Sequence, residues 1–323
     1  MTLPKSINIL ILEFISERSI TGGSADTYKR ILNVWVLWMI QNADIKAPSK
    51  ANVITWIKSL EEAGRSQLTI ESYVTVISIF FNWMESKQYW PNITKGVKVK
   101  RASREYRKHY IPEADMVQWL ASLHTDTLNE KRNSAIINLM LNTAFRCIEI
   151  SRFNVGDIRQ TGNGYAIRIQ RKGHKEKDQS TGIPSECVTM INDYLAMRGH
   201  VNESDALFSS HRSGRDCERL LPKSVGQIIT NQLTIAKLKS KWITPHSLRH
   251  SSAVYAIKNG ATEFEVKAMM GHSSPTTTAR YLRMIEEETM EMNPAARCVN
   301  DYIRNGGKST KKLIQNEKFS VSL

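Results

Sequence analysis

Residues 244–283 hold four side chains whose types and spacing suit chemistry on a phosphodiester. His246 and Arg249 stand three residues apart, and Tyr281 comes nine residues after His272. An arginine guanidinium presents a fork of N–H donors that matches two phosphate oxygens. A histidine can donate to an oxygen or move a proton near neutral pH, and a tyrosine phenol can form a covalent intermediate without a metal. This segment is therefore the predicted active site.

Local signals predict that three helices separated by turns carry these residues. The first is expected over about 244–260, because Thr244 is a hydroxyl N-cap and Pro245 occupies the first helical position. A second helix is expected over about 262–271, and a third from Ser274 onward, carrying the tyrosine. Helix, turn and helix would then bring the four side chains into one small neighbourhood.

The segments PHSLRHSSA and MMGHSSPTTTARYL resemble the second signature box of the tyrosine recombinases, also called the phage integrase family. That family's pattern is His-x-x-Arg, then Gly-His, then Tyr. Here the matching residues are His246, Arg249, His272 and Tyr281, all at the family's spacing. A lone His-x-x-Arg would not identify a family, whereas four required residues at the family's spacing do indicate one.

The segment NTAFRCIEI resembles the family's first box, Thr-Gly-Leu-Arg-x-x-Glu. Arg146 takes the arginine position and Glu149 the acidic position, while Ala144 and Phe145 replace the usual Gly-Leu.

Lys172 in the sequence RKG resembles the lysine of the family's Gly-Lys-Gly turn, with Arg171 in place of the leading glycine. Lys175 and Lys177 compete for this role. A generic basic loop that touches DNA phosphate is the alternative interpretation of the hairpin.

The resemblance implies a role for each residue. Tyr281 would attack a DNA phosphodiester to form a 3′-phosphotyrosyl bond and release a 5′-hydroxyl. Arg146 and Arg249 would neutralise the phosphate in the transition state, and His272 would donate to a non-bridging oxygen. Lys172 would protonate the leaving 5′-oxygen.

His246 would assist the tyrosine proton or bind the phosphate, and Glu149 would hold the first-box turn. No metal, ATP or other cofactor is implied, since the phosphotyrosyl bond conserves the energy of the broken bond. The family's reaction proceeds through a Holliday junction in a tetramer on two double-stranded DNA sites, in some cases with a paralogous recombinase or accessory proteins. A C-terminal segment, expected at about 286–303, would dock on a neighbouring protomer.

The apolar periodicity predicts a mainly α protein with a small β-hairpin or sheet in its second half, an α+β class. Helices are expected at 7–17, 24–42, 49–64, 66–88, 112–120, 131–142, 148–153, 186–198 and 223–239, with a strand at 165–170 and a return strand that begins at Ile183.

Four domains or segments follow from this pattern. Residues 1–100 resemble the family's SAM-like helical core-binding domain, and residues 111–303 its catalytic domain. Residues 101–110 are a basic linker and residues 304–323 a flexible basic tail. The side chains predicted to contact DNA are Lys98, Lys100, Arg101, Arg104, Arg107 and the hairpin residue Lys175. With few residues ahead of the first helix, the architecture resembles compact Xer-type recombinases.

Composition agrees with a polyanionic partner. The 323 residues carry a net charge of +14 and 41% hydrophobic residues, enough for a folded core. The four cysteines form no C-x-x-C pair, which disfavours zinc and disulfide frameworks and indicates reduced thiols in the cytoplasm. No apolar run of roughly eighteen residues is present, so no membrane association is expected.

The key residues have other possible interpretations. His246 and His250 lie four apart, as metal ligands on a helix do, but Arg249 beside them disfavours a cation. Tyr281 could be an ordinary core tyrosine. Two alternative functions are a DNA-binding accessory protein that has lost cleavage and a relaxing topoisomerase with the same tyrosine chemistry.

Overall fold

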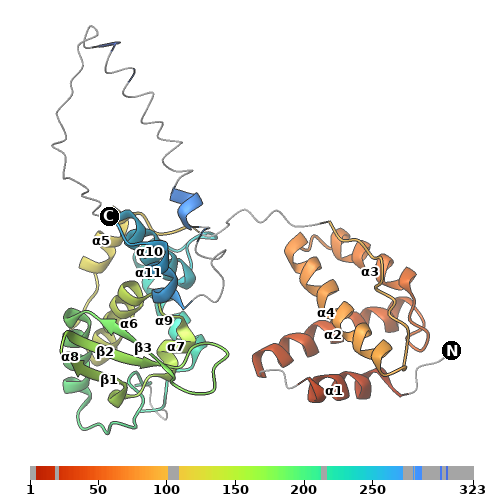
Figure 1. Ribbon diagram of the computed structural model, residues 1–323, viewed down its shortest axis with the longest axis horizontal. Coiled ribbons are helices and arrows are strands. Elements are labelled where there is room, and N and C mark those ends of the chain that lie inside the picture. Colours follow the sequence, from red (N-terminus) through yellow and green to blue (C-terminus); the bar gives the residue numbers. More distant parts are fainter. Residues whose placement is uncertain are drawn as a thin grey trace, which may run out of the picture. The chain divides into compact units, whose positions relative to one another are not determined.

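The computed structural model describes residues 5–18, 22–100, 109–211, 217–271, 279, 281–285, 299 and 303–304. The chain divides into two compact units, residues 1–105 and 106–323 (Figure 1). Each unit has its own hydrophobic core.

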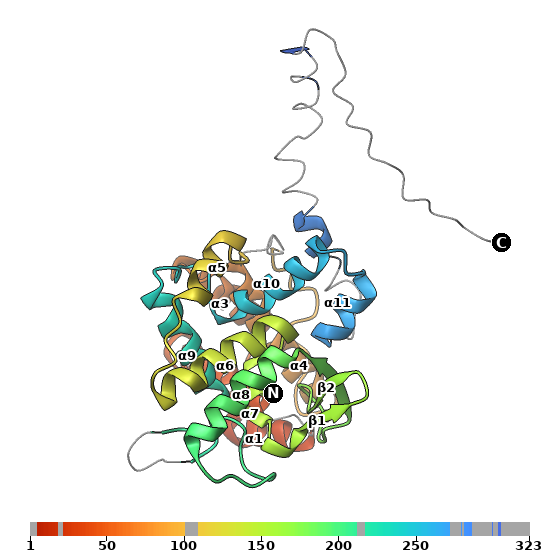
Figure 2. The same cartoon turned by 90° about the vertical axis from the view of Figure 1, so that its left-hand side faces the viewer.

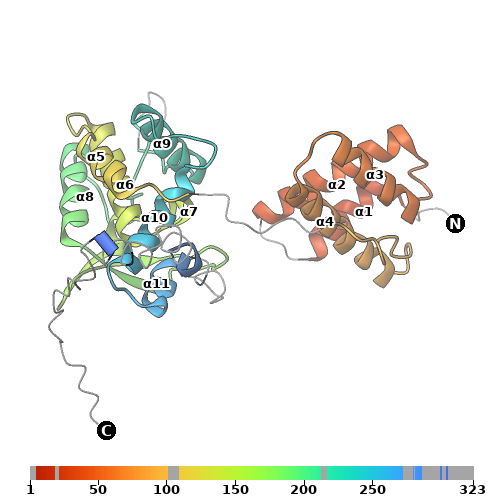
Figure 3. The same ribbon diagram turned by 90° about the horizontal axis from the view of Figure 1, so that it is seen from above.

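Over its described residues, 5–18 and 22–100, the N-terminal unit is a bundle of four helices, which Figure 3 shows from above. They are α1 (Ile7–Glu17), α2 (Gly22–Asn42), α3 (Lys50–Glu62) and α4 (Gln67–Ser86). Ser49 and Ser66 cap α3 and α4 through their side chains, which satisfies backbone donors that the first turn leaves unpaired. Aromatic side chains fill the core: Phe14 meets Phe80 edge to face at 5.3 Å, and Trp35 meets Phe81 in the same way.

The C-terminal unit is also mainly helical. Its elements are α5 (Glu113–Ala121), α6 (Leu128–Thr143), α7 (Cys147–Arg152), the 3₁₀ turn η1 (Val155–Asp157), β1 (Ile158–Thr161), β2 (Gly164–Ile169), β3 (Gln179–Ile183), α8 (Ser185–Arg198), α9 (Pro222–Ile235), α10 (Pro245–Lys258) and α11 (Glu263–Met270). Helix α6 packs against α8, α9 and α10 and lies at the centre of the unit (Figure 2). Its apolar side chains are buried around most of its circumference, as expected of a core helix.

A three-stranded antiparallel sheet stands beside these helices, in the order β1-β2-β3. The register pairs Ile158 with Ile167, and Tyr165 with Ile183. The predicted fold class, mainly α with a small sheet, is confirmed. The prediction that the return strand begins at Ile183 is wrong, because β3 ends there. Both β1 and β3 are short, mostly exposed edge strands, so they carry little of the apolar alternation that reveals a strand in sequence.

Several predicted features lie outside the described residues. These are His272, the start of the helix expected from Ser274, the linker residues Arg101, Arg104 and Arg107, and nearly all of 286–323. Tyr281 is described, and residues 279 and 281–285 are helical. No helix in the described parts of the chain is long and apolar enough to cross a bilayer.

Candidate active site

The turn between α6 and α7 positions Arg146. Helix α6 ends at Thr143, and Ala144 follows with a φ of 54°, in the left-handed region that glycine adopts without strain. The first box of the phage integrase family has glycine at this position, so alanine costs about 1 kcal/mol in backbone strain. The Ala144 methyl is buried in the cluster that contains Tyr281, which offsets about 0.8 kcal/mol of that cost. The turn therefore keeps its shape despite the substitution.

Glu149 holds Arg146 in place. Its carboxylate accepts from the Arg146 backbone N–H and from the guanidinium, both at 2.9 Å, and so caps the start of α7. Glu149 is fully buried, whereas the Arg146 side chain is 25% exposed. A second guanidinium, from the buried Arg171, lies 3.5 Å from the same carboxylate. Arg146 is thus anchored at its base with part of its side chain open to solvent.

Arg249 is buried at the start of α10, with 2% of its surface exposed. Its guanidinium donates to the carbonyl of Ala144 and, at 2.6 Å, to the carbonyl of Met270. Burial, together with the charge of Arg146, lowers the pKa of Arg249 to about 10. Arg249 therefore joins the first-box turn to the end of α11, and it lies near Arg146 at that turn.

The hydroxyl of Tyr281 lies 2.6 Å from Nδ1 of His250, and both residues are buried. The His250 ring in turn meets the ring of His246 edge to face, with 4.4 Å between centroids. His246 itself is exposed. The three rings form a row from the surface to the phenol, so a histidine stands within hydrogen-bond reach of the only tyrosine that the sequence nominated as a nucleophile.

His250 is the residue that sequence reasoning missed, since it was considered only as a metal ligand beside His246. The available signal was its helical spacing from His246 and its position next to Arg249. Among the residues that the structure describes, no group of three His, Cys, Asp or Glu side chains could hold a metal ion.

The hairpin lysines differ in their surroundings. Lys177 forms an ion pair with the buried Asp157, which binds it to the η1 turn. Lys172 and Lys175 are both exposed on the β2–β3 connection. In the N-terminal unit, Lys98 and Lys100 are exposed as well.

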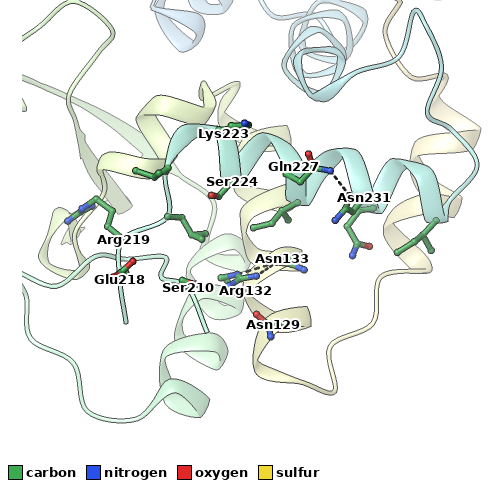
Figure 4. A pocket seen from close by; sticks show the side chains of 15 residues that line it. Asn129, Arg132, Asn133, Ser210, Glu218, Arg219, Lys223, Ser224, Gln227 and Asn231 are labelled. Atoms are coloured by element: carbon green, nitrogen blue, oxygen red, sulfur yellow. Dashed lines mark hydrogen bonds between the residues drawn. The ribbon is translucent and has the colours of Figure 1, made fainter. Parts of the chain in front are cut away.

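A polar groove of about 850 Å³ lies between the start of α6 and helix α9 (Figure 4). Its charged side chains are Arg132, Arg219, Lys223 and Glu218. Its described lining contains no tyrosine, histidine or cysteine, so it offers neither a phenol nucleophile nor an imidazole base. Arg132 and Arg146 are separated by nearly the full length of α6, roughly 20 Å at 1.5 Å per residue. We therefore place the chemistry at Tyr281 and not in this groove.

Comparisons with known proteins identify the family of the chain. A model of the phage integrase family matches residues 109–288, more than half of the chain. The chain belongs to the phage integrase family.

Curated relatives of similar length carry recombinase names. Tyrosine recombinase XerD of Oceanobacillus iheyensis is 26% identical over 284 residues, which cover 85% of this chain and 92% of the relative. Tyrosine recombinase XerC of Haemophilus ducreyi is 25% identical over 272 residues, covering 83% and 86% of the two chains.

Solved structures show the same fold. The XerH site-specific recombinase bound to a palindromic difH substrate, in a post-cleavage complex, has a TM-score of 0.69 at 18% identity, covering 84% of this chain and 79% of that one. A lambda integrase dimer bound to a COC′ core site has a TM-score of 0.67 at 14% identity, covering 86% and 97%.

Proposed function

We propose that this protein is a site-specific DNA recombinase or integrase that cleaves and rejoins double-stranded DNA through Tyr281. The observation that carries the proposal is the short contact between the Tyr281 hydroxyl and His250, next to the buried Arg249. A phenol that contacts a base can attack a phosphate without a metal when nearby arginines stabilise the charge on the phosphate oxygens. Names of relatives in the same family support the reaction class.

In the proposed cleavage step, the Tyr281 oxygen bonds to phosphorus while the bond from phosphorus to the 5′-oxygen breaks. The phenol proton passes to Nδ1 of His250, which lies 2.6 Å from the phenol oxygen and accepts the proton in the tautomer that leaves this nitrogen unprotonated. Lys172 gives its proton to the departing 5′-oxygen, and the DNA 3′ end remains as a phosphotyrosine. Arg146 and Arg249 stabilise the charge that grows on the non-bridging oxygens.

The remaining roles follow the family's reaction. His272 would donate to a non-bridging oxygen, and His246 would support the proton at His250 through their ring contact. A 5′-hydroxyl from a second strand would then attack the phosphotyrosine and regenerate Tyr281. Exchange of one strand pair gives a Holliday junction, and exchange of the second gives recombinants.

The proposed assembly is a homotetramer on two DNA sites, with room for a paralogous recombinase or accessory proteins as partners. Residues 1–100 would bind the core site, residues 101–110 would follow the phosphate backbone, and residues 111–303 would catalyse. The segment 286–303 would dock on a neighbouring protomer, and the tail 304–323 would stay basic and exposed. The DNA substrate would be met in the cytoplasm.

The test is covalent trapping on nicked suicide duplexes taken from the DNA that flanks the gene. On a denaturing gel run after incubation in EDTA, the wild-type protein should give a slowly migrating adduct, and Tyr281→Phe should give none. Tyr165→Phe, a half-buried tyrosine on β2, is the matched control and should keep the adduct.

The alternatives predict different results. DNA binding in a gel-shift assay with no adduct on any duplex would favour an accessory protein without cleavage. Relaxation of supercoiled plasmid with an adduct but no recombinant product would favour a topoisomerase.

A further inference from the structure

Arg171 stands where the resembling family pattern has glycine, directly before Lys172, yet its side chain is buried and only 5% exposed. Nη1 lies 3.5 Å from the Glu149 carboxylate, and Nε lies 3.2 Å from the side-chain oxygen of Gln179. Nη2 lies 3.4 Å from the carbonyls of Ala268 and Met269, at the end of α11. The side chain thus bridges the hairpin, the first-box turn and the second-box helix.

Space for this bridge comes from Gly271. A Cβ atom at that position would lie 2.7 Å from Nε of Arg171, and Gly271 has a φ of 59° that glycine adopts without strain. The Arg171 guanidinium also lies over the ring of Phe145, 5.8 Å from its centroid. Burial lowers the pKa of Arg171, and the Glu149 charge opposes that effect. Within the protein, loss of these partners would leave an uncompensated buried charge, so the contacts hold the guanidinium in place.

The main chain of Arg171 is anchored too. Arg152 donates to the Arg171 carbonyl at 3.2 Å, and the N–H of His174 donates to the same carbonyl at 3.1 Å. The second bond closes a tight turn over residues 171–174, in which Gly173 has a φ of 92°, as the third residue of a type II turn requires. Lys172 is the second residue of this turn. Its Cα is therefore held directly beside Arg171. Lys175 lies beyond the turn, where the Gln170 side chain donates to its carbonyl at 2.9 Å.

We propose that Arg171 is a positioning residue for the protonation of the leaving 5′-oxygen: it fixes the turn so that Lys172, and not Lys175, reaches that oxygen. This inference rests on the proposed cleavage reaction. A lysine side chain has four rotatable bonds, so the position of its Cα decides which atoms its ammonium group can meet. A displacement of about 1 Å can cost a hundredfold in rate.

The experiment compares two suicide duplexes, one normal and one with sulfur in place of the bridging 5′-oxygen at the scissile phosphate. In the second, the bond from phosphorus to sulfur breaks and a thiolate leaves. Because a thiol has a pKa of about 8.5, the thiolate can leave without a proton from an acid. The rate of adduct formation is measured for Arg171→Met, Arg171→Lys, Lys172→Ala and Lys175→Ala.

On the normal duplex, Lys172→Ala should slow adduct formation about 10²–10⁴-fold, the contribution of a general acid. Arg171→Met should slow it about 10–10²-fold. The sulfur duplex should restore both variants to near the wild-type rate. Lys175→Ala removes a predicted phosphate contact, so any slowing should be the same on both duplexes, with no rescue by sulfur. Arg171→Lys keeps the charge and should fall between wild type and Arg171→Met, and it serves as the test variant if Arg171→Met fails to fold by circular dichroism.

Equal slowing of the Arg171 variants on both duplexes, or no slowing on either, would overturn the proposal. Rescue of Lys175→Ala in place of Lys172→Ala would overturn it as well. Absence of any adduct from the wild-type protein is a separate outcome, which refutes the proposed cleavage itself.

Discussion

Replacement of Glu149 by glutamine should destabilise the C-terminal unit strongly, because it removes a buried charge that two arginines share. Glu149 is fully buried and pairs with Arg146 and Arg171. Glutamine retains one acceptor oxygen for the Arg146 backbone N–H but leaves the buried Arg171 cation without its counter-ion. Breaking a buried pair from one side costs about 3–5 kcal/mol. For a unit of this size, that corresponds to a fall in melting temperature of roughly 10 °C.

The chain offers a matched control in Glu130, which occupies the same third position of a capping box at the start of α6. Its carboxylate accepts from the backbone N–H and hydroxyl of Thr127, both at 2.9 Å, but Glu130 is only half-buried and water screens its charge. Glu130→Gln should therefore lower the melting temperature far less than Glu149→Gln.

Differential scanning calorimetry of the full-length variants, following the transition of the C-terminal unit, is the measurement. The backbone hydrogen bond from Thr127 lowers the pKa of Glu130, so its small contribution should be present near neutral pH and disappear as the pH falls through that lowered value. Equal losses for the two variants at neutral pH would show that burial of the Glu149 ion pairs adds nothing, and the reasoning would fail.

Three further predictions concern other parts of the C-terminal unit. His250→Gln should slow adduct formation on the normal suicide duplex about 10²–10⁴-fold, because glutamine can accept the Tyr281 hydrogen bond but not its proton. DNA binding in a gel-shift assay should stay unchanged. An unchanged rate of adduct formation would remove His250 from the mechanism. Gly271→Ala should lower the free energy of unfolding, measured by urea titration, by more than about 1 kcal/mol, since its φ of 59° disfavours any Cβ and the Arg171 guanidinium occupies the space. An unchanged free energy of unfolding would contradict the close approach of Arg171 to Gly271. Burial raises the pKa of Cys187 to about 11, so iodoacetamide near pH 8 should alkylate the exposed Cys217 much faster than Cys187. Peptide mass spectrometry measures the two rates, and equal labelling would contradict the burial of Cys187.

Local patterns were enough to predict most helices and the family. The apolar spacing of α3 and α4 places these helices within a few residues of their bounds. The same approach failed on the sheet. Strand β1 was not predicted, and β3 was predicted to begin where it ends, because exposed edge strands show little apolar alternation.

The sequence by itself determined the residue types of the site and their order along the chain: Arg146, Lys172, Arg249 and Tyr281 stand in motifs that can be read without a structure. Which residues those side chains meet was decided by the packing of segments far apart in sequence. His250 reaches the Tyr281 hydroxyl across 31 positions, and Arg249 reaches the Ala144 carbonyl across 105. Caps and helical periods depend on neighbours within one or two turns, whereas the partner of a buried charge depends on which distant segment covers it.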